Sequence, residues 1–181
     1  VYCNNVGIQN NGKNVFSYDG FSTAYNADGT VSASAEMYED TILECTWDTE
    51  AGHFVGEGSI AALLQEPESI YKSLRYGTEK FLHQCGIKKM TIGLSGGIDS
   101  AITAAMYADI LGAENVLLIN LPSVYNSETT KKIAYNLAKN LGANYAVIPI
   151  SHSCEHTEEQ LTSTPITNMA NGSTFNLELS N

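Results

Sequence analysis

Residues 88–111, KKMTIGLSGGIDSAITAAMYADIL, contain the turn that decides the fold of this chain. The first seven residues form an apolar, β-prone run, and residues 99–111 repeat apolar side chains at helical spacing as far as Gly112. A short Gly/Ser segment separates the two runs. The stretch therefore predicts a strand that passes through a tight turn directly into a helix.

The same alternation continues downstream. Residues 116–121 are a second strand candidate, Ser127 is suited to cap a following helix, Gly142 is suited to end it, and residues 145–150 form a third strand candidate. The buried stripe of that helix is expected at Ile133, Leu137 and Leu141. Strands that alternate with helices predict an α/β fold with a parallel sheet and right-handed crossovers.

The amino-terminal part has the pattern of antiparallel strands. Residues 21–25 and 30–35 flank the turn residues Asp28-Gly29 and are expected to pair, and Thr41–Trp47 is a further strand candidate. A helix of about 18 residues is expected to start near Pro67. One face of that helix is formed by Ile70, Leu74, Gly77 and Phe81.

Three regions follow from these patterns. Residues 1–47 form the β-rich part, residues 48–65 form a glycine-containing linker, and residues 66–181 form the α/β part. The polar segment 151–181 is expected to be loop. It contains the alternating triplet His152, Cys154 and His156, for which a loop is favoured over a metal site.

The composition excludes several classes of protein. Nine Lys and Arg against 20 Asp and Glu give a formal charge of -11, which opposes binding to the phosphate backbone of nucleic acids. No apolar run approaches the roughly 20 residues of a membrane span, and the amino terminus has no export-signal pattern. The four cysteines are dispersed, as in cytoplasmic proteins with reduced thiols.

The glycine-rich turn is the leading candidate site, since ligands of parallel sheets bind where strands give way to helices. Gly96 and Gly97 let several main-chain N–H groups converge at the positive end of the following helix, which suits an anion. Ser95 and Ser100 add hydroxyl donors for phosphate oxygens, and the Asp99 carboxylate suits a divalent cation between protein and phosphate.

Two other interpretations of the turn remain open. Residues 93–97 match the GxSxG nucleophile elbow of serine hydrolases, with Ser95 as nucleophile and His152 or His156 as base. The turn could also be purely structural, with Asp99 capping the helix. The dinucleotide fingerprint is excluded by Ser95, and the lysine-containing phosphate loop is excluded because no lysine precedes Ser100.

These residues carry a family resemblance. SGGIDS, formed by residues Ser95, Gly96, Gly97, Ile98, Asp99 and Ser100, resembles the pyrophosphate-binding loop of the ATP pyrophosphatase superfamily. Residues 93–143 as a whole are similar to the synthetase domain of NAD synthetases. The resemblance implies a partial Rossmann-like sheet of the adenine nucleotide α-hydrolase type. Asn5-Val6-Gly7 and Asp19-Gly20-Phe21-Ser22 resemble the end of the nitrilase-like glutaminase domain of glutamine-dependent NAD synthetases.

The resemblance implies a carbon-nitrogen ligase that converts deamido-NAD to NAD. ATP and Mg²⁺ adenylate the nicotinate carboxylate with release of diphosphate, and ammonia taken from glutamine then displaces AMP. Residues 95–100 would hold the diphosphate, Asp99 would ligate the metal, and Leu121 and Ser123 would meet the adenosine part. Another amidating or thiolating enzyme of the superfamily, such as a GMP or asparagine synthetase relative, is the alternative.

The family pattern also implies what this chain lacks. A nitrilase-like site uses Glu, Lys and Cys, and the matching residues would precede Val1, so Cys3 is expected to be structural. Three parallel strands are visible where five are usual, which predicts an inactive fragment cut inside both domains. Association into homo-oligomers is expected by resemblance.

Overall fold

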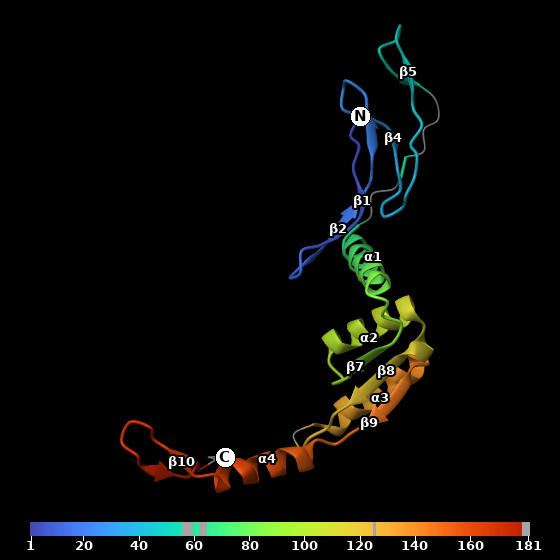
Figure 1. Cartoon of the computed structure of the whole chain (residues 1–181). Coiled ribbons are helices and arrows are strands. Elements are labelled where there is room, and N and C mark those ends of the chain that lie inside the picture. The colour runs from blue at the N-terminus through green and yellow to red at the C-terminus, as the bar shows by residue number, and fades with distance from the viewer. Residues whose placement is uncertain (56–59, 62–64, 125, 179–181) are drawn as a thin grey trace. The chain divides into compact units, whose positions relative to one another are not determined.

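The computed structural model describes residues 1–55, 60–61, 65–124 and 126–178. The chain divides into two compact units, Val1–Lys88 and Lys89–Asn181. Figure 1 labels their helices and strands.

The second unit contains a three-stranded parallel sheet. Its strands run in the order β7-β8-β9, with Gly93 opposite Ile119 and Asn120 opposite Val147 at the carboxyl edge. The predicted alternation of strands and helices is confirmed. The elements are β7 (Met90–Gly93), α2 (Ile98–Leu111), the short 3₁₀ helix η1 (Ala113–Asn115), β8 (Val116–Asn120), α3 (Glu128–Leu141) and β9 (Asn144–Val147).

Helices α2 and α3 pack on the sheet through small side chains. Ala104 of α2 and Ala134 and Ala138 of α3 are buried against Val116 and Leu118 of the central strand. The two helices also contact each other, so they cover the same face of the sheet. Alanine at these positions allows the helices to approach the sheet closely.

The ends of α3 follow the sequence prediction. The Thr130 N–H donates to the Ser127 hydroxyl oxygen at 3.2 Å, which satisfies one free donor of the first turn. Gly142 ends the helix in the left-handed conformation, with φ of 70°, which side chains with a Cβ rarely adopt. Local signals therefore determine both boundaries.

The described residues of the first unit form three antiparallel hairpins and one helix. The predicted pairing of residues 21–25 with 30–35 is confirmed by β3 and β4, whereas the other two hairpins were not predicted. The elements are β1 (Val6–Asn10), β2 (Val15–Asp19), β3 (Thr23–Tyr25), β4 (Val31–Ser34), β5 (Thr46–Asp48), β6 (His53–Val55) and α1 (Glu68–Gln84).

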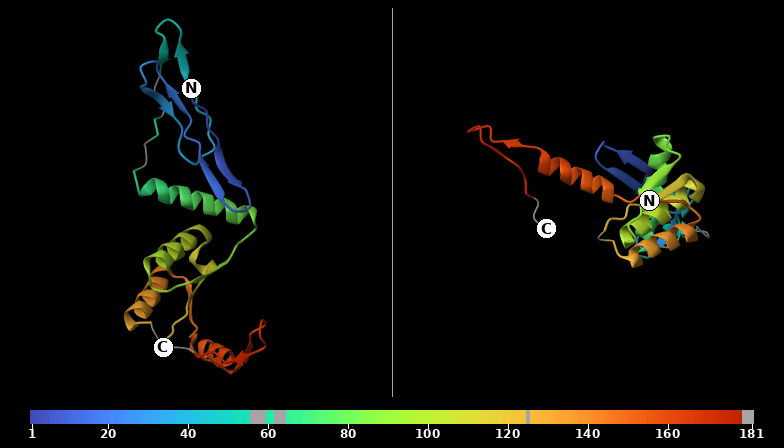
Figure 2. Two further views of the ribbon diagram at one scale, coloured as in Figure 1. Left: turned by 90° about the vertical axis from the view of Figure 1, so that its left-hand side faces the viewer. Right: turned by 90° about the horizontal axis from the view of Figure 1, so that it is seen from below.

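Helix α1 begins immediately after Pro67, as predicted, and packs beside the β1–β2 hairpin (Figure 2). The Ser17 and Ser73 hydroxyls are 2.8 Å apart, and Gly77 faces Ser17. The predicted apolar face is only partly covered, since Ile70 and Leu74 are half exposed.

The expectation of a strand over Thr41–Trp47 is wrong for most of its length. Only Thr46 and Trp47 belong to a strand, β5, which pairs with β6 inside the segment predicted to be linker. The Trp47 and Phe54 rings meet edge to face across this hairpin, with centroids 4.9 Å apart. Ile42 is almost fully exposed, so the apolar run around it is not buried in this unit.

The expectation that residues 151–181 form loop is also wrong. Ser151–Ser163 form helix α4, and Ile166–Thr167 (β10) pairs with Thr174–Phe175 (β11) around an Asn-Gly turn. Helix α4 buries no residue, so it lacks the apolar stripe by which the other helices are recognised. His152, Cys154 and His156 therefore lie on a helix.

No helix within the described ranges combines the length and the apolar character needed to cross a bilayer.

Shortening a buried side chain of the central strand β8 tests the packing of the second unit. Leu118→Ala removes a fully buried side chain, so the free energy of unfolding should fall by about 2–5 kcal/mol. Val147→Ala, at a half-exposed position of β9, is the matched control and should change it by less than about 1 kcal/mol. Urea unfolding followed by circular dichroism measures both, and equal effects would contradict this account of the core.

Candidate functional site

The candidate site lies where β7 gives way to α2, at the carboxyl edge of the parallel sheet. Strand β7 ends at Gly93, and α2 begins at Ile98. The Leu94 N–H still donates to the Ile119 carbonyl oxygen at 2.8 Å, so the chain leaves the sheet only after Leu94. Residues 95–97 therefore form a very short connection, here called the SGG turn.

Gly96 holds the SGG turn against the start of α3. Its φ is +89°, and a Cβ built there would collide with the Thr130 carbonyl oxygen and lie 3.1 Å from the carbonyl carbon. Both atoms belong to a helix backbone that cannot move aside cheaply. Only glycine fits this position, because it has no Cβ and tolerates positive φ.

The hydroxyls of Ser95 and Ser100 lie together at the N-terminus of α2. Ser95 Oγ is 3.1 Å from Ser100 Oγ, and the Gly97 N–H donates to Ser95 Oγ at 3.2 Å. The Ser100 hydroxyl donates to the Gly97 carbonyl oxygen at 3.0 Å. These bonds are exposed, and both hydroxyls can rotate to donate to an anion at the helix N-terminus.

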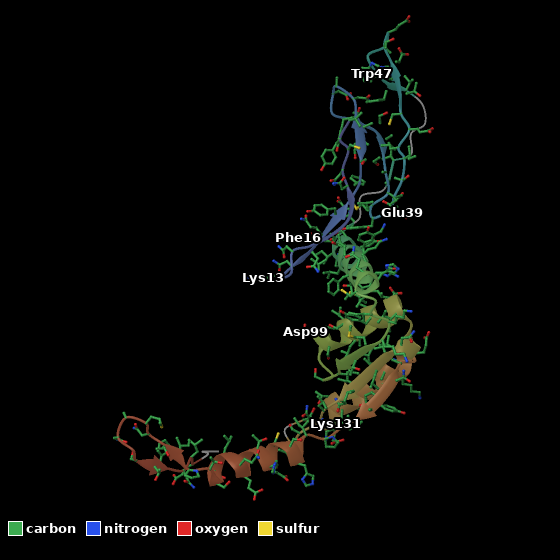
Figure 3. The ribbon with its side chains drawn as sticks, viewed as in Figure 1. Lys13, Phe16, Glu39, Trp47, Asp99 and Lys131 are labelled. Atoms are coloured by element: carbon green, nitrogen blue, oxygen red, sulfur yellow. The ribbon has the colours of Figure 1, made fainter. Side chains whose placement is uncertain are left out.

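Asp99 lies in the first turn of α2 and is exposed to solvent (Figure 3). The residue that precedes the helix is Gly97, and no side chain caps the helix. The structural alternative, in which Asp99 caps α2, is therefore wrong. The carboxylate is instead available to a cation that approaches the SGG turn.

Asp99 is a single carboxylate. In the part of the chain that the structure describes, no three His, Cys, Asp or Glu side chains gather into a possible metal site. Mg²⁺ typically takes one or two protein carboxylates and completes its octahedron with water and substrate phosphates. One exposed carboxylate beside an anion-binding turn fits that mode of binding.

The serine hydrolase interpretation lacks its base. The Ser95 hydroxyl is bonded to Gly97 and Ser100, and among the described residues no imidazole is bonded to it. His152 and His156 lie on α4, where His152 Nδ1 is 3.8 Å from Glu155. A nucleophilic serine needs a base within hydrogen-bonding distance, so this arrangement disfavours the elbow.

A hollow of about 200 Å³ adjoins the SGG turn. This volume is below the usual 300–1,000 Å³ of small-molecule pockets, so the hollow suits one part of a ligand. It brings together the ends of β7 and β8 with two of the predicted site residues, Ser95 and Leu121. Its lining is Gly93, Leu94, Ser95, Ile119, Asn120, Leu121 and Asn126.

Ser123 does not line the hollow, but it is hydrogen-bonded to Asn126, which does. Its N–H and its hydroxyl both donate to Asn126 Oδ1, at 2.8 Å and 3.0 Å. The predicted residues thus lie in two groups: residues 95–100 at the start of α2, and Leu121 with Ser123 after β8. The hollow lies between the two groups.

Sequence reasoning missed Asn120 and Asn126. Asn120 is 3% exposed, and its Nδ2 donates to the Leu94 carbonyl oxygen at 2.6 Å. The available signal was an amide that ends the apolar run of residues 116–119. A polar residue in a buried strand position requires a specific partner.

Lys131 follows Thr130, whose backbone contacts the SGG turn. Lys131, in the first turn of α3, forms an ion pair of 2.8 Å with Glu128 (Figure 3). Main-chain N–H groups and the α2 dipole are the groups at the SGG turn that would attract an anion.

Comparison with known proteins agrees with this geometry. The family model described as NAD synthase matches residues 70–176, which include every element of the site. Glutamine-dependent NAD(+) synthetase from Synechocystis is 36% identical over 150 residues, covering 83% of this chain and 26% of that protein.

Solved structures show the same arrangement. Glutamine-dependent NAD+ synthetase from Acinetobacter baumannii, in complex with ADP, superposes with a TM-score of 0.80 at 27% identity over 89% of this chain and 30% of that one. NMN synthetase from Francisella tularensis gives a TM-score of 0.51 at 25% identity over 56% of this chain and 42% of that one.

The chain spans about a quarter to a third of the length of the curated relatives that it matches. The family match covers more than half of the residues. It includes the strand, the SGG turn and the helix on which the resemblance of residues 93–143 depends. The chain belongs to the NAD synthase family.

Proposed function

We propose that the SGG turn and the first turn of α2 bind the diphosphate part of ATP in a glutamine-dependent NAD synthetase. The observation that carries the proposal is the contact between Gly96 and the Thr130 backbone, which holds a glycine turn at the N-terminus of α2 beside two serine hydroxyls. The relative from Acinetobacter baumannii was solved in complex with ADP, which supports an adenine nucleotide as a ligand.

The proposed reaction joins two polyanions. The carboxylate of deamido-NAD attacks the α-phosphorus of ATP, the bond to the bridging oxygen breaks, and diphosphate leaves. Ammonia then attacks the acyl adenylate and releases AMP, which leaves the carboxamide of NAD. The protein must neutralise charge and hold the reacting atoms in line, and it needs no nucleophile of its own.

Each group of site residues has a role in this scheme. N–H groups of the SGG turn and the hydroxyls of Ser95 and Ser100 bind the departing diphosphate. Residues Leu121 and Ser123 bind the adenosine part across the hollow that Asn126 helps to line. Asp99 would hold Mg²⁺, which when bound supplies charge neutralisation at the phosphates.

The first unit is proposed to be the last part of a nitrilase-like glutaminase domain. Its hairpins carry Asn5-Val6-Gly7 and Asp19-Gly20-Phe21-Ser22, the segments on which that resemblance rests. Glutamine is then the proposed source of ammonia, which a nitrilase-like site releases with a catalytic Glu, Lys and Cys.

Direct binding tests the proposed function. The full chain should bind Mg·ATP and Mg·diphosphate in isothermal titration calorimetry, and the two ligands should compete because they share the SGG turn. A fluorophosphonate should leave Ser95 unlabelled. Labelling of Ser95 together with absence of nucleotide binding would refute the synthetase assignment in favour of a hydrolase.

Gly96→Ala tests the turn itself. The added Cβ collides with the Thr130 backbone and disfavours positive φ, so the affinity for Mg·ATP and for Mg·diphosphate should fall at least ~10-fold. Gly77→Ala in α1 is the control, because its Cβ would lie 3.7 Å from Ser17, an ordinary contact. Unchanged affinity in the Gly96 variant would exclude the SGG turn as the anion site.

Asp99→Asn tests the metal ligand. The substitution keeps the size of the side chain but removes its charge, so the gain in ATP affinity on adding Mg²⁺ should shrink several-fold, while Mg²⁺-free ATP should bind no more weakly. Titrations with and without Mg²⁺ measure the difference. Glu155→Gln on α4 changes the net charge equally and serves as the control; the same loss in both variants would assign the effect to net charge.

A further inference from the structure

Asn120 links the extensions of two strands at the carboxyl edge of the sheet. Its main-chain carbonyl oxygen accepts from the Ile148 N–H at 2.9 Å, on the side of β9. Its side-chain Nδ2 donates to the Leu94 carbonyl oxygen at 2.6 Å, on the side of β7. One residue of the central strand therefore holds the chain on both sides just beyond the parallel sheet.

The bond from Asn120 fixes the last residue before the SGG turn. Leu94 is 1% exposed, and its N–H is held by the Ile119 carbonyl oxygen at 2.8 Å. With its carbonyl oxygen held by Asn120, both polar groups of Leu94 are bonded. The direction in which the chain continues into Ser95 is therefore set by this residue pair.

The orientation of the Asn120 amide is determined by Leu94. If the amide were flipped, two acceptor oxygens would face each other at hydrogen-bonding distance. In the orientation shown, Asn120 Oδ1 is buried and has no hydrogen-bonding partner among the described residues. The bond from Nδ2 to the Leu94 carbonyl oxygen is therefore the contact through which this amide acts on the turn.

We infer that Asn120 is a positioning residue for the diphosphate-binding turn. It holds the entry of the turn through Leu94, while the Thr130 backbone confines Gly96 two residues later. Between these two points the chain has little freedom, so the Ser95–Gly97 N–H groups keep one direction. The role of Asn120 in ligand binding rests on the proposed function, whereas its role in ordering the turn does not.

Asn144, at the amino-terminal edge of the parallel sheet, provides a control for Asn120. Asn144 begins β9, and its Nδ2 donates to the carbonyl oxygens of Glu114 and Val116 at 2.9 Å and 3.3 Å. This amide also joins segments by bonding main-chain carbonyl groups, but it lies at the amino end of the strands. Removing the Asn144 amide should lower the free energy of unfolding without affecting the SGG turn.

The experiment compares Asn120→Leu with Asn144→Leu in the full chain. Amide hydrogen exchange of Leu94 and Gly97, whose N–H groups are hydrogen-bonded, should become at least ~10-fold faster in N120L and change less than ~2-fold in N144L, under conditions where both variants are folded. Asn120→Ala is the second variant and should act in the same direction if N120L does not fold. Equal exchange at these amides in the wild-type chain and the folded Asn120 variant would overturn the inference.

Ligand titration separates this inference from the proposed function. If both hold, N120L should weaken Mg·diphosphate and Mg·ATP by the same factor of ~10, as expected from misplaced donors, while N144L should stay near the wild-type value. If the wild-type chain binds neither ligand, the proposed function fails and the exchange data alone decide the role of Asn120. Loss of affinity equal in N120L and N144L would show a general structural effect and overturn the inference.

Discussion

The packing of β8 beneath α2 and α3 is the constraint on which the second unit depends. Val116 and Leu118 are fully buried, and they meet alanines at positions 104, 134 and 138. Small residues on both helices bring the helix axes close to the sheet and to each other. The start of α3 consequently lies against the start of α2, and the Thr130 backbone meets Gly96.

This packing shows how an acidic chain could present the proposed anion site. The formal charge is -11, and the lysine nearest in sequence to Thr130 is paired with Glu128. Main-chain N–H groups and a helix dipole act only over a few ångströms, so they do not require a basic surface. Their strength depends on direction, which makes the residues that orient the turn as important as those that would touch a ligand.

The two sides of the hollow depend on different kinds of interaction. On the β7 side, the turn is confined by a backbone contact at Gly96 and by the amide of Asn120. On the β8 side, Leu121 is half exposed, and Ser123 is held through Asn126. The β7 side of the hollow is thus held more tightly than the β8 side, which suits the proposed function because the phosphates would have to be aligned for transfer.

Local signals in the sequence determined the strands and helices of the second unit as far as β9. These signals act between neighbouring residues: the apolar runs, the Ser127 cap and the helix stop at Gly142. The glycine turn that carries the family resemblance is a local signal of the same kind. Helix α4 was missed because it buries nothing and has no apolar stripe. Only the tertiary structure decided the roles of Asn120 and of Thr130, because each acts on a residue 26 or 34 positions away that packing brings into contact.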